Sequence, residues 1–361
     1  MRILVVNAGS SSLKLSVVRQ GGVDEHTNIE RWDGVGHVEP VEEFLRVVGK
    51  LEAVGHRVVH GGPRYADPVP IDDEAVGYLE SITDLAPLHN PRAVAGIRAV
   101  DRLLPGLPAV AAFDTGFHST LSPAAATYAL PREWNRRWGL RRYGFHGLSH
   151  GWAVRRAAEL VDRRLSDLRI VSCHLGAGAS LAAVSGGVSV DTTMGFTPLA
   201  GLVMQTRSGS VDPGLLTWLL QHGGVDPETL NRTLEHDSGM KGLSGTSGDL
   251  RDVLSGREAG DEACALALDV YVHVLVREIG GMAASAGGLD VLVFTGGIGE
   301  HSPYVRAAVA ARLGHLGVTV DDRANGSTSS DGIIGQATAT TVVVTAAEDL
   351  EVARLVGKVL G

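Results

Sequence analysis

Cysteine is scarce in this sequence: Cys173 and Cys264 are the two among 361 residues. So few cysteines exclude a disulfide-rich scaffold, and their separation excludes a zinc site built on closely spaced cysteines. Aromatic residues make up 5% of the chain, and no apolar run approaches the ~18 residues that a membrane span needs. The apolar start after Met1 and Arg2 is too short for a secretory signal. We therefore expect a soluble, cytoplasmic protein that does not bind membranes.

Basic residues are outnumbered, with 32 Lys and Arg against 41 Asp and Glu and a net charge of −9. This balance lacks the basic surface that nucleic-acid binding requires, so we expect no nucleic-acid partner. It leaves room for a small anionic ligand, which a few arginines can bind. The sequence also contains no G-x-x-x-x-G-K-[ST], G-x-G-x-x-G, H-E-x-x-H or EF-hand motif. The common nucleotide and metal signatures therefore do not apply.

The length and a hydrophobic fraction of 44% predict two domains, each with its own core. Apolar runs typical of strands alternate with longer amphipathic segments, which indicates the α/β class. A polar turn cluster is expected over 324–332. Expected strands cover 3–6, 13–18, 109–113, 170–173, 181–185, 291–295 and 340–345, and expected helices cover 41–51, 73–85, 91–103, 151–165, 213–221, 261–286, 303–316 and 348–360.

Two of the expected hairpins resemble each other. Each begins with Arg-Ile, turns at Ala-Gly-x-Ser and continues as a second apolar strand, over 2–18 and 169–185. We interpret them as two halves of the chain built on one plan. The alternative is that any two short hairpins share such features.

The 47 glycines cluster in turns that directly follow apolar strands. Three such turns lie within 7–14, 174–178 and 294–300, and the first is followed by Lys14. Consecutive backbone N–H groups in such turns can bind phosphate oxygens, with the lysine as a point charge. One turn alone would indicate only a change of direction. Three of them favour a single polyphosphate ligand bound between two lobes.

A second set of residues carries charge. Arg57, Arg207, His146 and Asp114 each lie beside a glycine turn or a strand end. Any one of them alone would indicate a surface ion pair or a buried histidine. Together they suit phosphoryl transfer, in which cations stabilise the phosphoryl oxygens and a carboxylate positions metal or nucleophile.

One hydrolase-like motif is present, because residues 147–151 read G-L-S-H-G around Ser149. The motif requires a buried strand before the serine and a helix after it. A helix is expected after it, but the preceding R-R-Y-G-F is a poor buried strand. A serine hydrolase is therefore a minor alternative.

The sequence resembles a known family. Residues 5–15 read VVNAGSSSLKL and residues 191–199 read DTTMGFTPL. Both are similar to signature stretches of the acetate and propionate kinases, a group of the actin, sugar-kinase and heat-shock-chaperone ATPase superfamily, and the resemblance extends over nearly the whole chain. It implies two ribonuclease H-like lobes with an inter-lobe cleft. The N-terminal lobe would cover 1–140, joined by the C-terminal helix 346–361, and the nucleotide-binding lobe would cover 141–345.

The resemblance also implies an activity, the reversible transfer of phosphate from ATP to acetate, with Mg²⁺ as cofactor and a homodimer as assembly. The catalytic residues would be Asp114, Arg57, His146 and Arg207, and Asn7 and Glu348 would hold the metal. The substrate would contact Arg57 and an apolar pocket of Val59, Leu88, Phe145 and Pro198. The nucleotide would be bound by Lys14, Ser10, Ser12, His174, Leu175, Gly176, Ala177, Gly178, Asp249, Leu250, Arg251, Gly296, Gly297, Ile298, Gly299 and Glu300.

Acetate is already ionised at neutral pH, since a simple carboxyl has a pKa of ~4–5. Its attack on phosphorus therefore needs no general base, and we expect Asp114 to position groups rather than to abstract a proton.

The chain departs from the family pattern at several positions. Ala177 stands where the second phosphate loop has Asn, and Ala200, Gln205 and Ser210 stand where Glu, Gly and Asp are usual; Leu148 replaces a Thr. Two further alternatives follow for the function: a kinase for propionate or another short-chain carboxylate, and a non-catalytic nucleotide-binding switch of the same fold.

Overall fold

The computed structural model describes the chain from residue 1 to residue 361 except 10–11, 31, 33–38, 88 and 329. It consists of two compact units. Unit 1 comprises 1–119, 145–152 and 347–361, and unit 2 comprises 120–144 and 153–346.

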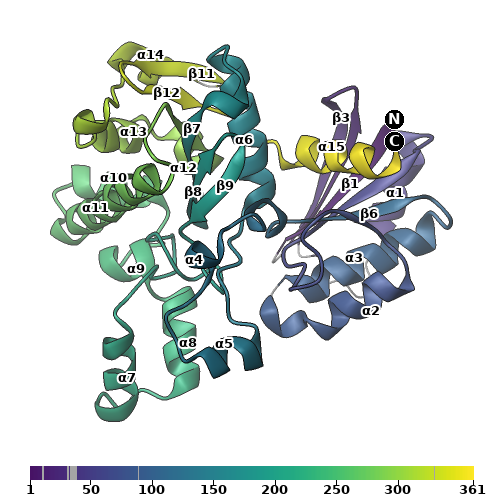
Figure 1. Ribbon diagram of the computed structural model, residues 1–361, viewed down its shortest axis with the longest axis horizontal. Helices are drawn as coiled ribbons and strands as arrows, with labels where there is room; N and C mark the ends of the chain where they lie inside the picture. Colours follow the sequence, from purple (N-terminus) through teal and green to yellow (C-terminus); the bar gives the residue numbers. More distant parts are fainter. Residues whose placement is uncertain (10–11, 31, 33–38, 88, 329) are drawn as a thin grey trace. The chain divides into compact units, whose positions relative to one another are not determined.

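Unit 1 is built on a six-stranded mixed sheet (Figure 1). Its order is β3-β2-β1-β4-β6-β5, with β1, β2 and β3 antiparallel, β1, β4 and β6 parallel, and β5 antiparallel at the edge. The strands are β1 (Arg2–Ala8), β2 (Ser12–Arg19), β3 (Gly22–Glu30), β4 (Ala53–Val58), β5 (Val69–Pro70) and β6 (Ala109–Phe113).

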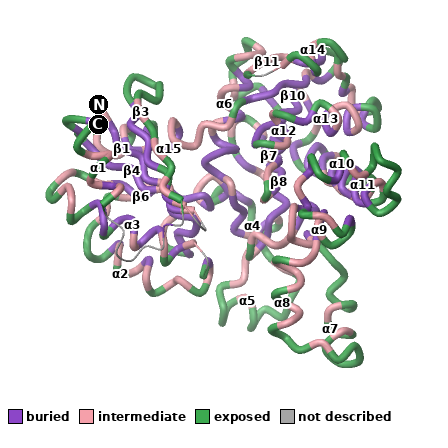
Figure 2. Tube along the Cα trace, turned by 180° about the vertical axis from the view of Figure 1, so that it is seen from behind, coloured by how far each residue is buried: buried purple, intermediate pink, exposed green. Residues whose placement is uncertain are grey.

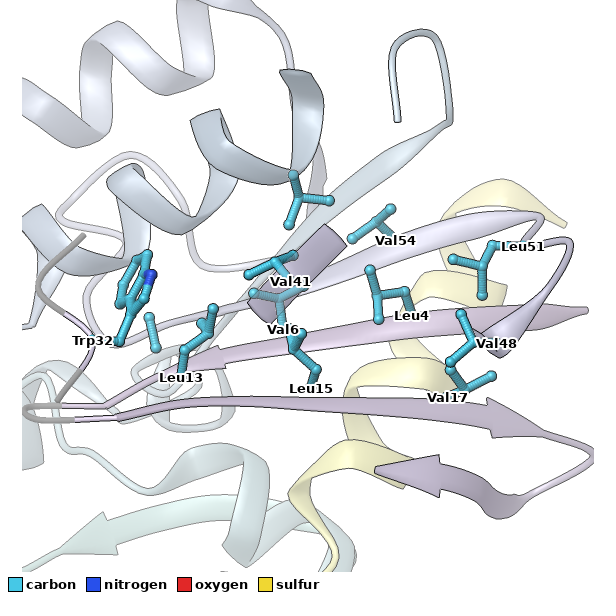
Figure 3. Packing of buried hydrophobic residues seen from close by; sticks show 12 residues of the cluster. Leu4, Val6, Leu13, Leu15, Val17, Trp32, Val41, Val48, Leu51 and Val54 are labelled. Atoms are coloured by element: carbon cyan, nitrogen blue, oxygen red, sulfur yellow. The ribbon is translucent and has the colours of Figure 1, made fainter. Parts of the chain in front are cut away.

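Helices cover both faces of this sheet because its central strands are apolar on both faces. On one face α1 (Glu39–Val48), α2 (Asp73–Ser81) and α3 (Asn90–Leu103) pack, with Leu4, Val6 and Leu15 facing Val41 and Val48 of α1 (Figure 3). On the other face lies α15 (Glu348–Leu360), which packs against a separate apolar cluster of β1, β4 and β6.

Unit 2 repeats the plan. Its sheet has the order β11-β12-β10-β7-β8-β9, with an antiparallel meander, two parallel crossovers and an antiparallel edge strand in the same sequence as in unit 1. This correspondence confirms the prediction that the two hairpins belong to halves of one plan. The strands are β7 (Arg169–Leu175), β8 (Ala179–Ser185), β9 (Val188–Thr192), β10 (Val291–Thr295), β11 (Gly332–Gln336) and β12 (Thr340–Val343).

The long helix α11 (Glu262–Ser285) packs on β7, β8 and β9. Asp261 caps it by accepting hydrogen bonds from the backbone N–H groups of Ala263 and Cys264. In contrast, α7 (Pro213–His222) has no buried residue and is largely exposed in Figure 2. The other helices are α4 (Pro123–Ala126), α5 (Arg132–Trp138), α6 (Gly147–Leu160), α8 (Pro227–His236), α9 (Gly239–Ser244), α10 (Leu250–Glu258), α12 (Gly296–His301), α13 (Pro303–Ala310) and α14 (Asp322–Ser327).

Two expected segments differ in the structure. The expected helix over 303–316 ends at Ala310 and is followed by a separate 3-10 turn over Gly314–Leu316. The expected turn cluster over 324–332 overlaps α14, because Asp321 caps a helix in this polar sequence by accepting from the N–H of Ala324.

The units also divide differently from the expected lobes 1–140 and 141–345. Residues 120–140 pack with unit 2, where Thr120 Oγ1 donates to the carbonyl of Ser189. Residues 145–152 pack with unit 1, because the N–H of Gly147 donates to the carbonyl of Asp114 at 2.8 Å. Within the described ranges, no helix is both long and apolar enough to cross a membrane.

Candidate functional site

Three adjacent strands of unit 1 place polar side chains in one row. Asn7 on β1 is paired in register with Lys14 on β2 and with Arg57 on β4. Residues in register on neighbouring strands point to the same face. This face is the one that α15 covers, since a Cβ at Gly55, two residues before Arg57, would lie 2.6 Å from Val352 Cγ1 of that helix.

Arg57 is the centre of this row. Its Nη2 and Nε donate to the two carboxylate oxygens of Asp114 at 2.6 and 3.1 Å, and its Nη1 donates to Asn7 Oδ1 at 2.9 Å. Glu348 Oε2 lies 3.4 Å from Nε. A guanidinium has five N–H groups, and the hydrogen bonds to described residues engage three of them. The structure therefore brings Asn7, Arg57, Asp114 and Glu348 together, as the resemblance implies.

Asp114 is buried in this cluster, and Asp349, next to Glu348, is half-buried. Burial raises the pKa of Asp114 to about 6, and the charge of Glu348 acts in the same direction, against the opposing effect of Arg57. Burial also raises the pKa of Asp349, whose carboxylate accepts a hydrogen bond from Ser16. Asp349 is not among the predicted site residues, although it directly follows Glu348 at the start of α15.

His146 precedes α6 with a backbone φ of +56°, which is unusual for a residue other than glycine. Such strained conformations are concentrated at functional sites. The neighbouring Gly147 is required by space, because a Cβ there would lie 2.2 Å from the carbonyl oxygen of Asp114. His146 is thus fixed next to the segment that carries Asp114.

Neutral histidines support this half of the site. Burial lowers the pKa of His118 to about 4, and its Nε2 hydrogen-bonds to the carbonyl of Phe145 at 3.1 Å. Burial lowers the pKa of His60 to about 4 as well, and its Nδ1 accepts from the N–H of Gly62. These contacts fix the loops that follow β4 and precede α6.

The expected apolar substrate residues are distributed over both units. Val59 and Phe145 are buried in unit 1, and Phe145 makes an edge-on ring contact with His60. Leu88, like Ser10 of the first turn, lies outside the described residues. Pro198 is in unit 2, where its carbonyl accepts from Arg207 Nη1 at 3.3 Å.

Arg207 also forms an ion pair with Glu235, 3.3 Å from Nε. No local pattern in the sequence marks Glu235 as its partner, since 28 positions separate them. The loop that carries Arg207 is closed by Ser210, whose Oγ accepts from the N–H of Gly201 at 2.9 Å. The serine therefore keeps a loop-closing hydrogen bond at a position where the family usually has Asp.

Unit 2 contains a cavity of about 460 Å³ formed by the second and third glycine turns. Of the expected nucleotide residues, Gly176, Ala177, Asp249, Leu250, Arg251, Gly297 and Ile298 line it. His174 pairs with Thr295 in the parallel register of β7 and β10, so the two turns leave neighbouring strands at the same edge of the sheet. The lining residues that the nucleotide prediction did not include are Gln205, Gly248, Leu254, His301 and Ser302.

Gln205 and Ala177 are neighbours in the cavity wall. The backbone N–H of Gln205 donates to the carbonyl of Ala177 at 3.2 Å. Arg251, which also lines the cavity, makes a two-pronged ion pair with Asp249, at 2.9 and 2.7 Å. These hydrogen bonds lower the pKa of Asp249 to about 2.

The third glycine turn is the start of α12. Gly296 has a φ of +77°, and a Cβ there would lie 2.8 Å from the carbonyl oxygen of Leu175. Arg306 is buried beneath this helix, where Nη1 donates to the carbonyls of Gly299 and Glu300 and the rest of the guanidinium binds Asn325. The Glu300 carboxylate accepts a hydrogen bond from the backbone N–H of Ala346. The contact that the structure shows for this predicted nucleotide residue is therefore one within the protein.

The serine hydrolase alternative fails on geometry. Ser149 is fully buried within α6, and no strand is formed over 140–146, so the required strand and elbow before it are missing.

The donors available to a metal are oxygen atoms. Across the described residues, no group of three or more His, Cys, Asp or Glu side chains could hold a metal ion. Asn7 Oδ1 and the Glu348 carboxylate both lie beside Arg57 and are hard oxygen donors. This set fits Mg²⁺, which binds through one or two protein oxygens and completes its shell with water and substrate phosphates.

Two units with the same sheet order, one with an arginine–carboxylate cluster and one with a glycine-lined cavity, define a two-lobed α/β phosphotransferase of the actin and sugar-kinase class. The sequence profile of the Acetokinase family matches residues 35–354. The chain therefore belongs to the acetokinase family, whose members are kinases that use ATP and act on acetate.

Acetate kinases of known sequence match this chain over nearly its full length. An acetate kinase of Synechococcus sp. (strain JA-2-3B'a(2-13)) is 44% identical, with 98% of each chain covered, and that of Thermotoga maritima is 42% identical, with 98% of this chain and 97% of the relative covered. Among solved structures, Porphyromonas gingivalis acetate kinase is 34% identical with a TM-score of 0.92 and covers both chains completely. A propionate kinase from Francisella tularensis is 32% identical with a TM-score of 0.90, covering 99% of this chain and all of its own.

Proposed function

We propose that this protein catalyses the reversible, Mg²⁺-dependent transfer of the γ-phosphoryl group of ATP to acetate, forming acetyl phosphate. The observation that carries the proposal is Arg57, a cation held in place by hydrogen bonds to Asp114 and Asn7. A carboxylate nucleophile approaching a polyphosphate needs such a cation to offset charge repulsion.

Within unit 1, Asp114 orients Arg57 through the two-pronged ion pair. Because acetate is ionised at neutral pH, Asp114 has no proton to accept from it. Arg57 binds the acetate carboxylate and then the phosphoryl oxygens as negative charge develops on them. His146 contacts the same oxygens, and Val59 and Phe145 exclude water from the methyl group.

Asn7 and Glu348 would hold the metal, which would offset negative charge on the nucleotide phosphates. Lys14, exposed on β2 beside Asn7, adds a positive charge to this row.

The nucleotide occupies the cavity of unit 2, where Gly176, Ala177 and Gly297 allow close approach of the backbone to phosphates. Leu250, Leu254 and Ile298 form its apolar wall, which suits a nucleobase. Arg207, from the same unit, supplies a second cation for the transferred group.

A second candidate substrate is propionate. The support for it is the likeness to the F. tularensis propionate kinase, which is less identical to this chain than the acetate kinases cited above. The test is acyl phosphate trapping as hydroxamate with ATP, Mg²⁺ and acetate, propionate or butyrate. The proposal requires acetate to have the highest kcat/KM; a higher value for propionate would replace acetate as the substrate. No product with any of the three would favour the nucleotide-binding switch.

We also propose a homodimer in the cytoplasm, where ATP is the common phosphoryl donor. The exposed apolar residues Leu215, Trp218 and Leu220 on α7 support the dimer, because a helix with no buried residue in its own chain presents an apolar surface to a partner. Sedimentation of the native protein and of Trp218→Asp tests it.

A further inference from the structure

Unit 1 contains a second cavity, of about 440 Å³, that the phosphotransfer chemistry does not use. It is lined by residues of β4, α2 and α3 and by the segment 71–73. Small-molecule sites in proteins have volumes of roughly 300–1,000 Å³, so this space is large enough for a ligand. It lies on the face of the sheet opposite to Arg57, since neighbouring residues of β4 point to opposite faces.

His56 lines this cavity. Its side chain is 2% exposed, and no residue in the described part of the chain gives its ring a hydrogen bond or an ion pair. Burial lowers the pKa of His56 to about 3, so the ring is neutral and carries one N–H donor and one nitrogen acceptor. A ligand that enters the cavity can supply this ring with a hydrogen-bond partner.

The other polar groups of the cavity are mostly carboxylates. Asp72, Asp73, Glu80 and Asp101 line it together with one cation, Arg98. Arg98 pairs with Glu80 at 2.6 Å.

The remaining carboxylates differ in what they bind. Asp72 accepts from the N–H of Ala75 as the cap of α2. Asp73 and Asp101 have no ion-pair partner among the residues that the structure describes. The cavity therefore carries uncompensated negative charge, which repels nucleotides and carboxylic acids. Part of its wall is apolar, with Val54, Ile97 and Leu104 among the lining residues.

We propose that this cavity binds a small organic cation: a primary ammonium group joined to an apolar, preferably aromatic, body with a hydroxyl group. The ammonium pairs with Asp73 and Asp101, the body covers the apolar walls, and the hydroxyl pairs with the ring of His56. Binding at this site does not depend on the phosphotransfer chemistry, so it is expected even if the proposed reaction is wrong.

Tyramine has all three features and is the probe. Two analogues each lack one of them: phenethylamine has no hydroxyl, and 2-(4-hydroxyphenyl)ethanol has no positive charge. Calorimetric titration of the full-length protein, with ATP, Mg²⁺ and acetate present to fill the phosphotransfer site, should show saturable binding of one tyramine per chain. Each analogue should bind roughly tenfold more weakly, as expected for the loss of one hydrogen bond or ion pair.

Gly77 offers a way to block the cavity. It lines the space from α2, and a Cβ built on it meets no atom within 4 Å, so a larger side chain can enter without a backbone clash. Gly77→Leu should reduce tyramine binding at least about tenfold. Gly281→Leu is the matched control, because Gly281 is an exposed helical glycine with equally open surroundings in unit 2, and it should bind tyramine as the native protein does.

The proposal is overturned if tyramine shows no saturable binding, if ATP or acetate displaces it, or if Gly77→Leu binds it like the native protein. If Gly77→Leu does not fold, as judged by circular dichroism, the double variant Asp73→Asn, Asp101→Asn carries the test. It should weaken tyramine roughly tenfold and leave the uncharged analogue unchanged; equal effects on both compounds would also overturn the proposal.

Discussion

The backbone N–H of Gln205 donates to the carbonyl of Ala177, so two positions at which this chain departs from the acetokinase pattern are neighbours in one cavity wall. The loop has lost a carboxamide at Ala177, and a carboxamide has appeared beside it at Gln205. Both positions line the space that we assign to the nucleotide. We therefore expect the side chain of Gln205 to supply the amide donor that the loop lacks at Ala177.

We expect Gln205→Ala to raise the KM for ATP by about tenfold with a smaller change in kcat, because it removes a ground-state hydrogen bond. Ala177→Asn alone should have little effect, but in the Gln205→Ala background it should restore most of the lost affinity. Steady-state kinetics of the two single variants and the double variant complete the cycle. Additive effects would show that the two positions act independently.

Arg57→Ala should reduce kcat on the order of 10³-fold, because the guanidinium stabilises charge that develops in the transition state. Arg57→Lys should rescue little of this loss, since a lysine cannot pair with both oxygens of Asp114 and also reach Asn7. ATP affinity, measured by equilibrium binding, should be nearly unchanged in both variants. A large loss of ATP binding would instead place Arg57 in nucleotide recognition.

Much of the fold follows from the sequence because its central strands are apolar and its helices are amphipathic. Strands β6 and β10 occupy the expected residues 109–113 and 291–295. In contrast, β3 was missed because its side chains are mostly exposed and polar, as suits an edge strand. The third glycine turn was expected as a loop, but it begins α12, which depends on Arg306 beneath it.

The cluster around Arg57 could be predicted because a family signature covers Asn7 and because the resemblance extends to the C-terminal helix that carries Glu348. Two other contacts could not be predicted in this way. One is the ion pair of Arg207 with Glu235, and the other is the set of hydrogen bonds that Arg306 donates to carbonyls of α12. Glu235 lies 28 positions from Arg207, and no local pattern marks the carbonyls of Gly299 and Glu300 as the acceptors of Arg306, so only the folded chain shows these contacts. The cavity beside His56 was hidden for the same reason, since its lining comes from separate helices and strands.

Arg306→Met should destabilise the protein by about 3 kcal/mol, because the buried carbonyls of Gly299 and Glu300 and the side chain of Asn325 lose their donors. It should also raise the KM for ATP, since α12 forms part of the cavity wall. Urea unfolding gives the first value and steady-state kinetics the second. Arg312→Met, at an exposed arginine shortly after α13, is the control and should change neither. Normal stability of Arg306→Met would show that these hydrogen bonds do not support the helix.

The stability of the protein should fall in mild acid, and His118 makes the contribution that is easiest to isolate. Burial lowers its pKa from 6.5 to about 4. Between these values the unfolded chain binds a proton at this position and the folded protein does not, so the free energy of unfolding decreases as the pH falls. From pH 6.5 to pH 4.5 this one group should remove about 2 kcal/mol. His118→Gln keeps an N–H donor for the carbonyl of Phe145 but cannot be protonated, so its urea midpoint should decline less over this range than that of the native protein. Parallel pH profiles for the two proteins would show that His118 is not held neutral in the folded state.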